Sequence, residues 1–95
     1  MGEFYKIKSG FELKTYDGKT FAIPGMNSGL YFNGMIELNA VGEFMFIRLQ
    51  NGTTIDKLAD EIMVNYSGAE RGLVISDIRN FIAQLENANL IETMN

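Results

Sequence analysis

The side chains that most often carry out chemistry in proteins are missing from this sequence. It contains no His and no Cys, which removes the imidazole base, the thiolate nucleophile and the commonest zinc and iron ligands. Asp56, Asp60 and Glu61 form an acidic group, but their spacing is typical of a solvated helix face. The glycine-rich segment 25–29 lacks the Lys and the spacing of a phosphate-binding loop. We therefore expect no catalysis, no cofactor and no bound metal.

The charge distribution argues against nucleic acid and membranes as partners. The net charge is −4, and residues 34–95 carry four basic against nine acidic side chains. Such an acidic half is a poor match for phosphate groups or for an anionic bilayer. The N-terminus has charges where a signal peptide needs an apolar run, and the absence of Cys suits a reducing compartment. These features predict a cytoplasmic protein with no nucleic-acid and no membrane partner.

The first third of the chain predicts a small antiparallel sheet. Residues 11–24 form a hairpin pattern around Asp17-Gly18, and residues 35–38 form a short third strand. A two-residue loop would mix apolar and charged side chains on each face. A three-residue loop over residues 16–18, with Gly18 as a bulge, pairs Leu13 with Phe21 and Phe11 with Ile23, so we expect that register.

The rest of the chain predicts three helices. The first runs from about residue 40 to 50, between an Asn39 cap and an Asn51-Gly52 stop. The second follows a Thr53-Thr54 cap, and the third starts at a Ser76 cap, with Asp77 complementing the helix dipole, and ends near residue 89. Leu90-Ile91 should pack back on the core. With 95 residues, we expect one domain over residues 1–95, an α+β fold in which a three-stranded antiparallel sheet precedes a three-helix cluster, in a winged-helix-like order β-β-β-α-α-α.

Several short motifs in this order resemble the PqqD family, named for the pyrroloquinoline quinone biosynthesis protein. The similar segments are FNGMIELNAVGEFMFIRLQNGTTIDKLADEI at residues 32–62 and SDIRNFIAQLENANLI at residues 76–91. Within them, the family-like motifs are Leu38-Asn39, Asn51-Gly52-Thr53-Thr54, Ile55 with Leu58-Ala59, and Asp77-Ile78 with Phe81-Ile82 and Leu85. Asn89 stands where the family usually has Gly, and Phe46 stands where Trp is common. Both substitutions keep the physical role, because Asn tolerates left-handed geometry and Phe fills an aromatic site.

The resemblance implies a non-enzymatic recognition element for ribosomally made precursor peptides. In such domains the leader peptide adds as an antiparallel strand against the third strand and lies beside the last helix. Partner enzymes are commonly radical S-adenosylmethionine proteins with iron–sulfur clusters, which this Cys-free chain could not ligate itself. A homodimer through the same strand edge stays open. The implied peptide-binding residues are Met35, Ile36, Glu37, Leu38, Asp77, Ile78, Arg79, Phe81, Ile82 and Leu85.

Each of these residues also has a purely structural interpretation. The third strand could be an ordinary edge strand that Glu37 protects, Asp77 a dipole partner and Arg79 a solvated charge. The apolar residues of the last helix have the spacing of a core stripe. The alternative function is a winged-helix DNA-binding transcription regulator, but its recognition helix would expose one basic and two acidic side chains. Those exposed positions are Asp77, Arg79, Asn80, Gln84, Glu86 and Asn87.

Overall fold

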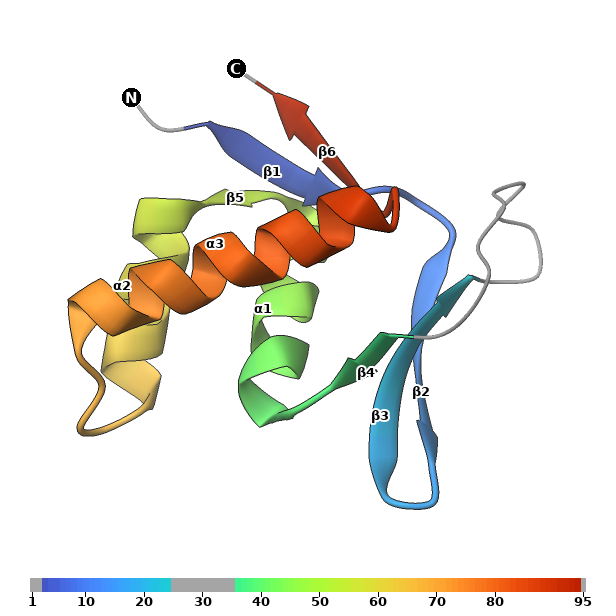
Figure 1. The fold of residues 1–95 in the computed structure, drawn as a ribbon, viewed down its shortest axis with the longest axis horizontal. Coiled ribbons are helices and arrows are strands. Elements are labelled where there is room, and N and C mark those ends of the chain that lie inside the picture. The colour runs from blue at the N-terminus through green and yellow to red at the C-terminus, as the bar shows by residue number, and fades with distance from the viewer. Residues whose placement is uncertain (1–2, 25–35, 95) are drawn as a thin grey trace.

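The computed structural model describes residues 3–24 and 36–94, which form two small antiparallel sheets and three helices (Figure 1). The predicted α+β class is confirmed. The elements in chain order are β1 (Phe4–Ile7), β2 (Phe11–Tyr16), β3 (Lys19–Pro24), β4 (Ile36–Leu38), α1 (Ala40–Asn51), β5 (Thr53–Thr54), α2 (Ile55–Asn65), α3 (Arg71–Asn87) and β6 (Ile91–Met94).

Local capping explains where the first two helices begin and where α1 ends. The Asn39 side chain accepts a hydrogen bond from the Gly42 backbone at 2.8 Å, which satisfies a free N–H group in the first turn of α1. Gly52 ends α1 with a φ of 89°, and the Thr54 hydroxyl accepts from the Lys57 backbone at 3.1 Å to cap α2. The predicted caps at Asn39 and Thr54 and the stop at Gly52 are confirmed.

Helix α3 begins at Arg71, so the predicted start at a Ser76 cap is wrong. Arg71 donates to Asp60 of α2, with 2.6 Å between Nη1 and Oδ1, and Val74 of the extra turn is buried. These contacts with the rest of the fold stabilise a first turn that has no side-chain cap. At the other end, Asn89 has a φ of 62°, which confirms the left-handed role expected for this Asn.

The β2–β3 hairpin has a two-residue loop, so the predicted three-residue bulge is wrong. Asp17 and Gly18 have φ angles of 53° and 77°, as in the turns whose twist matches that of paired strands. Phe21 pairs with Lys14 instead of Leu13, because Ala22 occupies the buried face. That choice of face agrees with β4, whose two inward side chains are opposite Ala22 and Thr20.

The second sheet has the order β5-β1-β6 and was not predicted. It joins segments that lie far apart in the sequence, with Tyr5 opposite Thr53 on one side and Ile7 opposite Ile91 on the other. Both termini therefore lie at the same end of the molecule (Figure 1). Leu90 and Ile91 are buried, which confirms that they pack back on the core.

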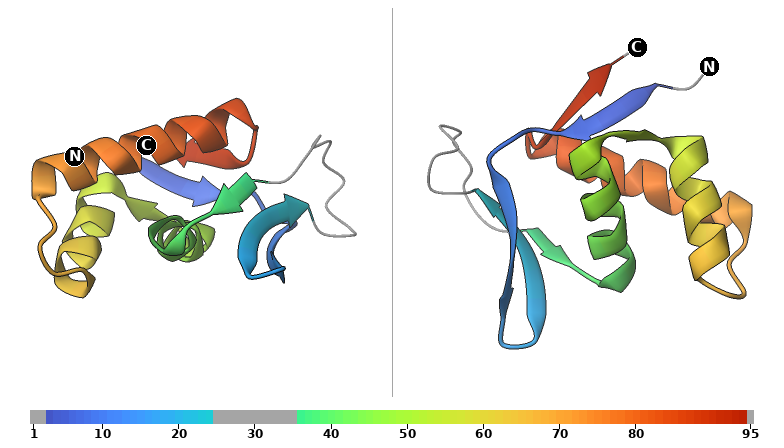
Figure 2. Two further views of the ribbon diagram at one scale, coloured as in Figure 1. Left: turned by 60° about the horizontal axis from the view of Figure 1, so that its bottom comes forward. Right: turned by 180° about the vertical axis from the view of Figure 1, so that it is seen from behind.

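One hydrophobic core joins the described elements. Helix α3 lies across α1 and α2, while the β2–β3 hairpin projects to one side (Figure 2). The largest fully buried side chains come from all three helices and from the turn before β6. They are Phe46, Leu49, Leu58, Ile78, Leu85 and Leu90. None of the helices in the described ranges is long and apolar enough to cross a membrane.

Candidate functional site

Strand β4 is one of the two edge strands of the β2-β3-β4 sheet. It pairs with β3 in antiparallel register, with Glu37 opposite Phe21, and no strand among residues 3–24 and 36–94 pairs with its other side. Ile36 and Leu38 point into the core, whereas Glu37 is exposed on the opposite face. An edge strand of this kind presents backbone N–H and C=O groups to any chain that approaches it.

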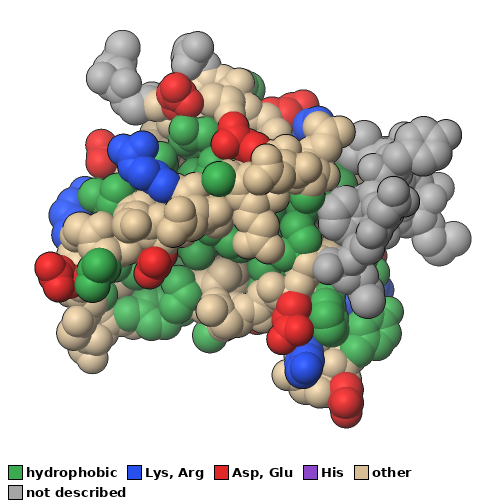
Figure 3. Space-filling view, in the orientation of Figure 1, with side chains coloured by type: hydrophobic (Ala, Val, Ile, Leu, Met, Phe, Trp, Pro, Cys, Tyr) green, Lys and Arg blue, Asp and Glu red, His purple; other side chains and the backbone are tan. Residues whose placement is uncertain are grey.

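A groove of about 420 Å³ lies between β4, the first turns of α1 and the middle of α3. Its floor is apolar and its rim carries carboxylate and amide side chains. In the space-filling view, mostly uncharged surface separates α3 from β4, and acidic side chains border it (Figure 3). The residues that line the groove are Glu37, Leu38, Asn39, Val41, Gly42, Met45, Asp77, Asn80, Phe81 and Gln84.

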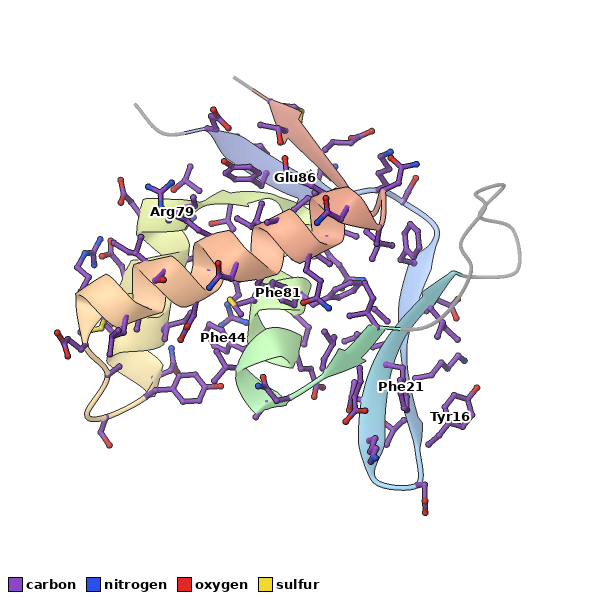
Figure 4. The ribbon with its side chains drawn as sticks, in the orientation of Figure 1. Tyr16, Phe21, Phe44, Arg79, Phe81 and Glu86 are labelled. Carbon is purple, nitrogen blue, oxygen red and sulfur yellow. The ribbon has the colours of Figure 1, made fainter. Side chains whose placement is uncertain are left out.

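Four of the residues implied by the resemblance meet in this groove. Glu37 and Leu38 come from β4, and Asp77 and Phe81 come from α3. Phe81 lies on the side of α3 that faces α1 and β4 (Figure 4). The structure thus brings together the third strand and the last helix, although they are far apart in the sequence.

Six of the implied residues do not line the groove. Arg79 lies on the other side of α3 (Figure 4). Burial and the Glu3 carboxylate raise the pKa of the Tyr5 phenol, and the positive charge of Arg79 partly offsets this rise. Met35 is outside the described residues. The other four are buried in the core, where they support the backbone of β4 and α3: Ile36, Ile78, Ile82 and Leu85.

The sequence-based set of binding residues omitted the α3 amides of the rim, Asn80 and Gln84. Asp77, Asn80, Phe81 and Gln84 are spaced as i, i+3, i+4 and i+7, so they share one face of α3. That face was visible as a pattern in the sequence. The other omitted residues come from the start of α1 and could be found only once β4 was placed beside it. They are Asn39, Val41, Gly42 and Met45.

Among the described residues, the groove is lined by two carboxylates and by no basic side chain. Asp77 lies in the second turn of α3, because the helix starts at Arg71. The helix dipole acts mainly in the first turn, so it does not account for an acidic residue at this position. Asp77 and Glu37 both lie without an ion pair to any residue in the described ranges.

The acidic group on α2 has structural partners. Asp56 and Asp60 approach Arg71, and Glu61 accepts from Arg48 at 3.2 Å. Within residues 3–24 and 36–94, no three acidic side chains are grouped as metal ligands. These carboxylates therefore connect α2 to α1 and α3.

Comparison with known proteins agrees with this geometry. The sequence profile of coenzyme PQQ synthesis protein D (PqqD) matches residues 22–91. The chain belongs to the PqqD family. The match begins in β3 and extends to the start of β6, so it includes every element of the groove. The resemblance predicted from the sequence motifs is confirmed.

A solved structure extends the PqqD-family comparison to almost the whole chain. The structure of "TbiB1 in Complex with the TbiA(beta) Leader Peptide" superposes with a TM-score of 0.69 at 25% sequence identity. The alignment covers 92% of this chain and 94% of that one. That protein was solved with a leader peptide bound. No sequence among curated proteins matches the chain.

Proposed function

We propose that this PqqD-family chain binds the leader of a ribosomally synthesised precursor peptide by β-strand addition to β4. The observation that carries the proposal is an edge strand, β4, whose outer side has no partner strand among the described residues and which lies directly beside a groove on α3. Backbone hydrogen bonds to the edge would supply affinity for any extended peptide, and the groove would select among side chains. The TbiB1 structure, which includes a leader peptide, supports this kind of ligand.

The chain would hold the leader while a separate enzyme modifies the rest of the precursor. No His or Cys is available for catalysis or for an iron–sulfur cluster. The proposed partner is a radical S-adenosylmethionine enzyme or another modifying enzyme, and the proposed compartment is the cytoplasm. The chain itself would have no catalytic activity.

The DNA-binding alternative has little support in the geometry. From its middle to its end, the exposed surface of α3 carries one basic side chain, Arg79, and two acidic side chains, Asp77 and Glu86. Phosphate contacts supply most of the non-specific affinity of DNA-binding proteins, and they need several basic side chains. Arg71, at the start of α3, is paired with Asp60.

Isothermal titration with the leader of the precursor peptide encoded beside this gene tests the proposal. We expect binding, and a loss of at least about tenfold in the Asn80→Trp variant, because the indole would fill the rim of the groove. Asn80 is exposed, so the fold should tolerate the change. Asn87→Trp is the matched control, since Asn87 is exposed on α3 but does not line the groove.

Two outcomes would contradict the proposal. In the first, a scrambled leader binds as tightly as the native one. In the second, Asn80→Trp binds like wild type.

Sedimentation of the free protein and of the complex tests whether a second copy uses the same edge, because a dimer through β4 should dissociate when the leader binds.

A further inference from the structure

The register of the β2-β3-β4 sheet fixes where the side chains of an added strand would point. On the face away from the core, Lys14, Phe21 and Glu37 form one row, since Lys14 is opposite Phe21 and Phe21 is opposite Glu37. A strand added to β4 would continue this row with one side chain next to Glu37. Its two neighbours would point to the other face, toward the groove.

Glu37 forms no ion pair with any residue in the described ranges, although Lys19 of β3 lies on the same face of the sheet, diagonal to it. Lys14 is separated from it by Phe21 and lies 3.7 Å from Glu12. Arg48 is also occupied, because it donates to Glu61 and stacks on the Phe44 ring at 4.0 Å. Directly opposed side chains of opposite charge stabilise a strand pair, and like charges destabilise it.

Asp77 adds negative charge on the far side of the groove. It is exposed on α3 and lines the groove together with the apolar Phe81. An added strand would therefore have the Glu37 carboxylate on its outer face and the Asp77 carboxylate on its groove side. The amides of Asn80 and Gln84 extend the same rim without changing its charge.

We infer that the peptide bound by this chain carries a basic residue, Lys or Arg, at the strand position opposite Glu37. Apolar residues on either side of it fill the groove over Leu38, Met45 and Phe81. Asp77, on the groove side, disfavours acidic side chains at the two neighbouring positions, which point toward the groove. This inference rests on the proposed strand addition and specifies the sequence class that the groove accepts.

Selection from a displayed library of short random peptides tests this without knowledge of the natural ligand. Wild type should enrich peptides with Lys or Arg at one fixed position between apolar residues. The Glu37→Lys protein should enrich Asp or Glu at that same position. Glu37 is exposed, so both proteins should fold alike, and amide chemical shifts of β4 and α3 locate the selected peptides.

The outcomes separate this inference from the function on which it rests. If the selected peptides shift β4 but show no basic position, or show no reversal with Glu37→Lys, the inference is wrong and strand addition survives. If no peptide is enriched, or if the peptides bind away from β4, both are wrong.

Single substitutions measure the size of the effect. Glu37→Gln should weaken a selected Lys-containing peptide by about two- to fivefold at low salt, as for exposed ion pairs. Asp77→Asn should weaken it less, because Asp77 lies on the groove side of the added strand. The difference in affinity between wild type and variant should shrink at about 1 M salt, where the Debye screening length falls to roughly 3 Å. Glu86→Gln is the control, because Glu86 lies on the opposite side of α3 (Figure 4). Equal losses for Glu86→Gln and Glu37→Gln would overturn the assignment.

Discussion

The two sheets in the described part of the chain both have three strands, but they differ in which segments of the sequence pair within them. In the β5-β1-β6 sheet, the central strand β1 is paired on both sides by segments from the middle and the end of the chain. The β2-β3-β4 sheet is built from one region of the sequence, and its edge strand β4 faces the groove. The difference is consistent with a division of roles, in which the first sheet holds the fold together and the second presents the proposed binding edge.

The largest expected effect compares one Ile from each sheet. Ile7 of β1 is 3% exposed, so Ile7→Ala should lower the free energy of unfolding by about 2–5 kcal/mol through lost burial and a residual cavity. Ile23 of β3 is half-buried on the face away from the core, and Ile23→Ala should cost about 1 kcal/mol. Urea unfolding of both variants measures the difference. Equal costs would show that the two sheets contribute alike to stability.

A smaller effect is expected at two glycines. Gly52, between α1 and β5, has a φ of 89°, and an added Cβ would overlap the Phe4 ring of β1. Gly52→Ala should cost about 2–3 kcal/mol. Gly18 in the hairpin turn has a φ of 77° with open space around it, so Gly18→Ala should cost about 1 kcal/mol from backbone strain alone. If the two costs are the same, the Phe4 contact adds nothing to the strain.

The smallest effect concerns the turn between α3 and β6. Asn89 has a φ of 62°, and its side chain accepts a hydrogen bond from Lys8 Nζ at 2.6 Å. Asn89→Ala should cost about 1 kcal/mol, because Ala disfavours this conformation. Asn89→Gly should stay within about 0.5 kcal/mol, since Gly adopts it freely. If Asn89→Gly lowers the free energy of unfolding as much as Asn89→Ala, the lost hydrogen bond with Lys8, and not the backbone conformation, accounts for the change.

Local signals in the sequence were sufficient for much of the fold. The caps at Asn39 and Thr54 and the stop at Gly52 each depend on a few neighbouring residues. The same holds for the hairpin position at Asp17-Gly18, but not for its register. The local pattern favours the three-residue loop, whereas the pairing of β4 with Ala22 decides which face is buried.

The features that were missed depend on contacts between distant segments. Four residues at Phe4–Ile7 form β1 only because Thr53–Thr54 and Ile91–Met94 provide partners on each side. The first turn of α3 likewise depends on Arg71 meeting Asp60. No local pattern contains this information.

The candidate site was predictable as a pair of elements but not residue by residue. The motifs indicated β4 and α3, and Glu37, Leu38, Asp77 and Phe81 do line the groove. The apolar stripe of α3 also contributed core residues such as Ile78 to the implied set. Which edge of the stripe borders the groove depends on the position of β4, and this follows from the fold.

The most direct test of the central claim is an amide chemical-shift titration with the cognate leader, alongside an Ile36→Pro variant. Pro in β4 removes a backbone donor and adds a steric block. The account predicts that the largest shifts fall on β4 and the groove face of α3, and that a folded Ile36→Pro protein binds more weakly. It is contradicted if the largest shifts fall on α2 or on the Asp17-Gly18 turn, or if folded Ile36→Pro binds as tightly as wild type.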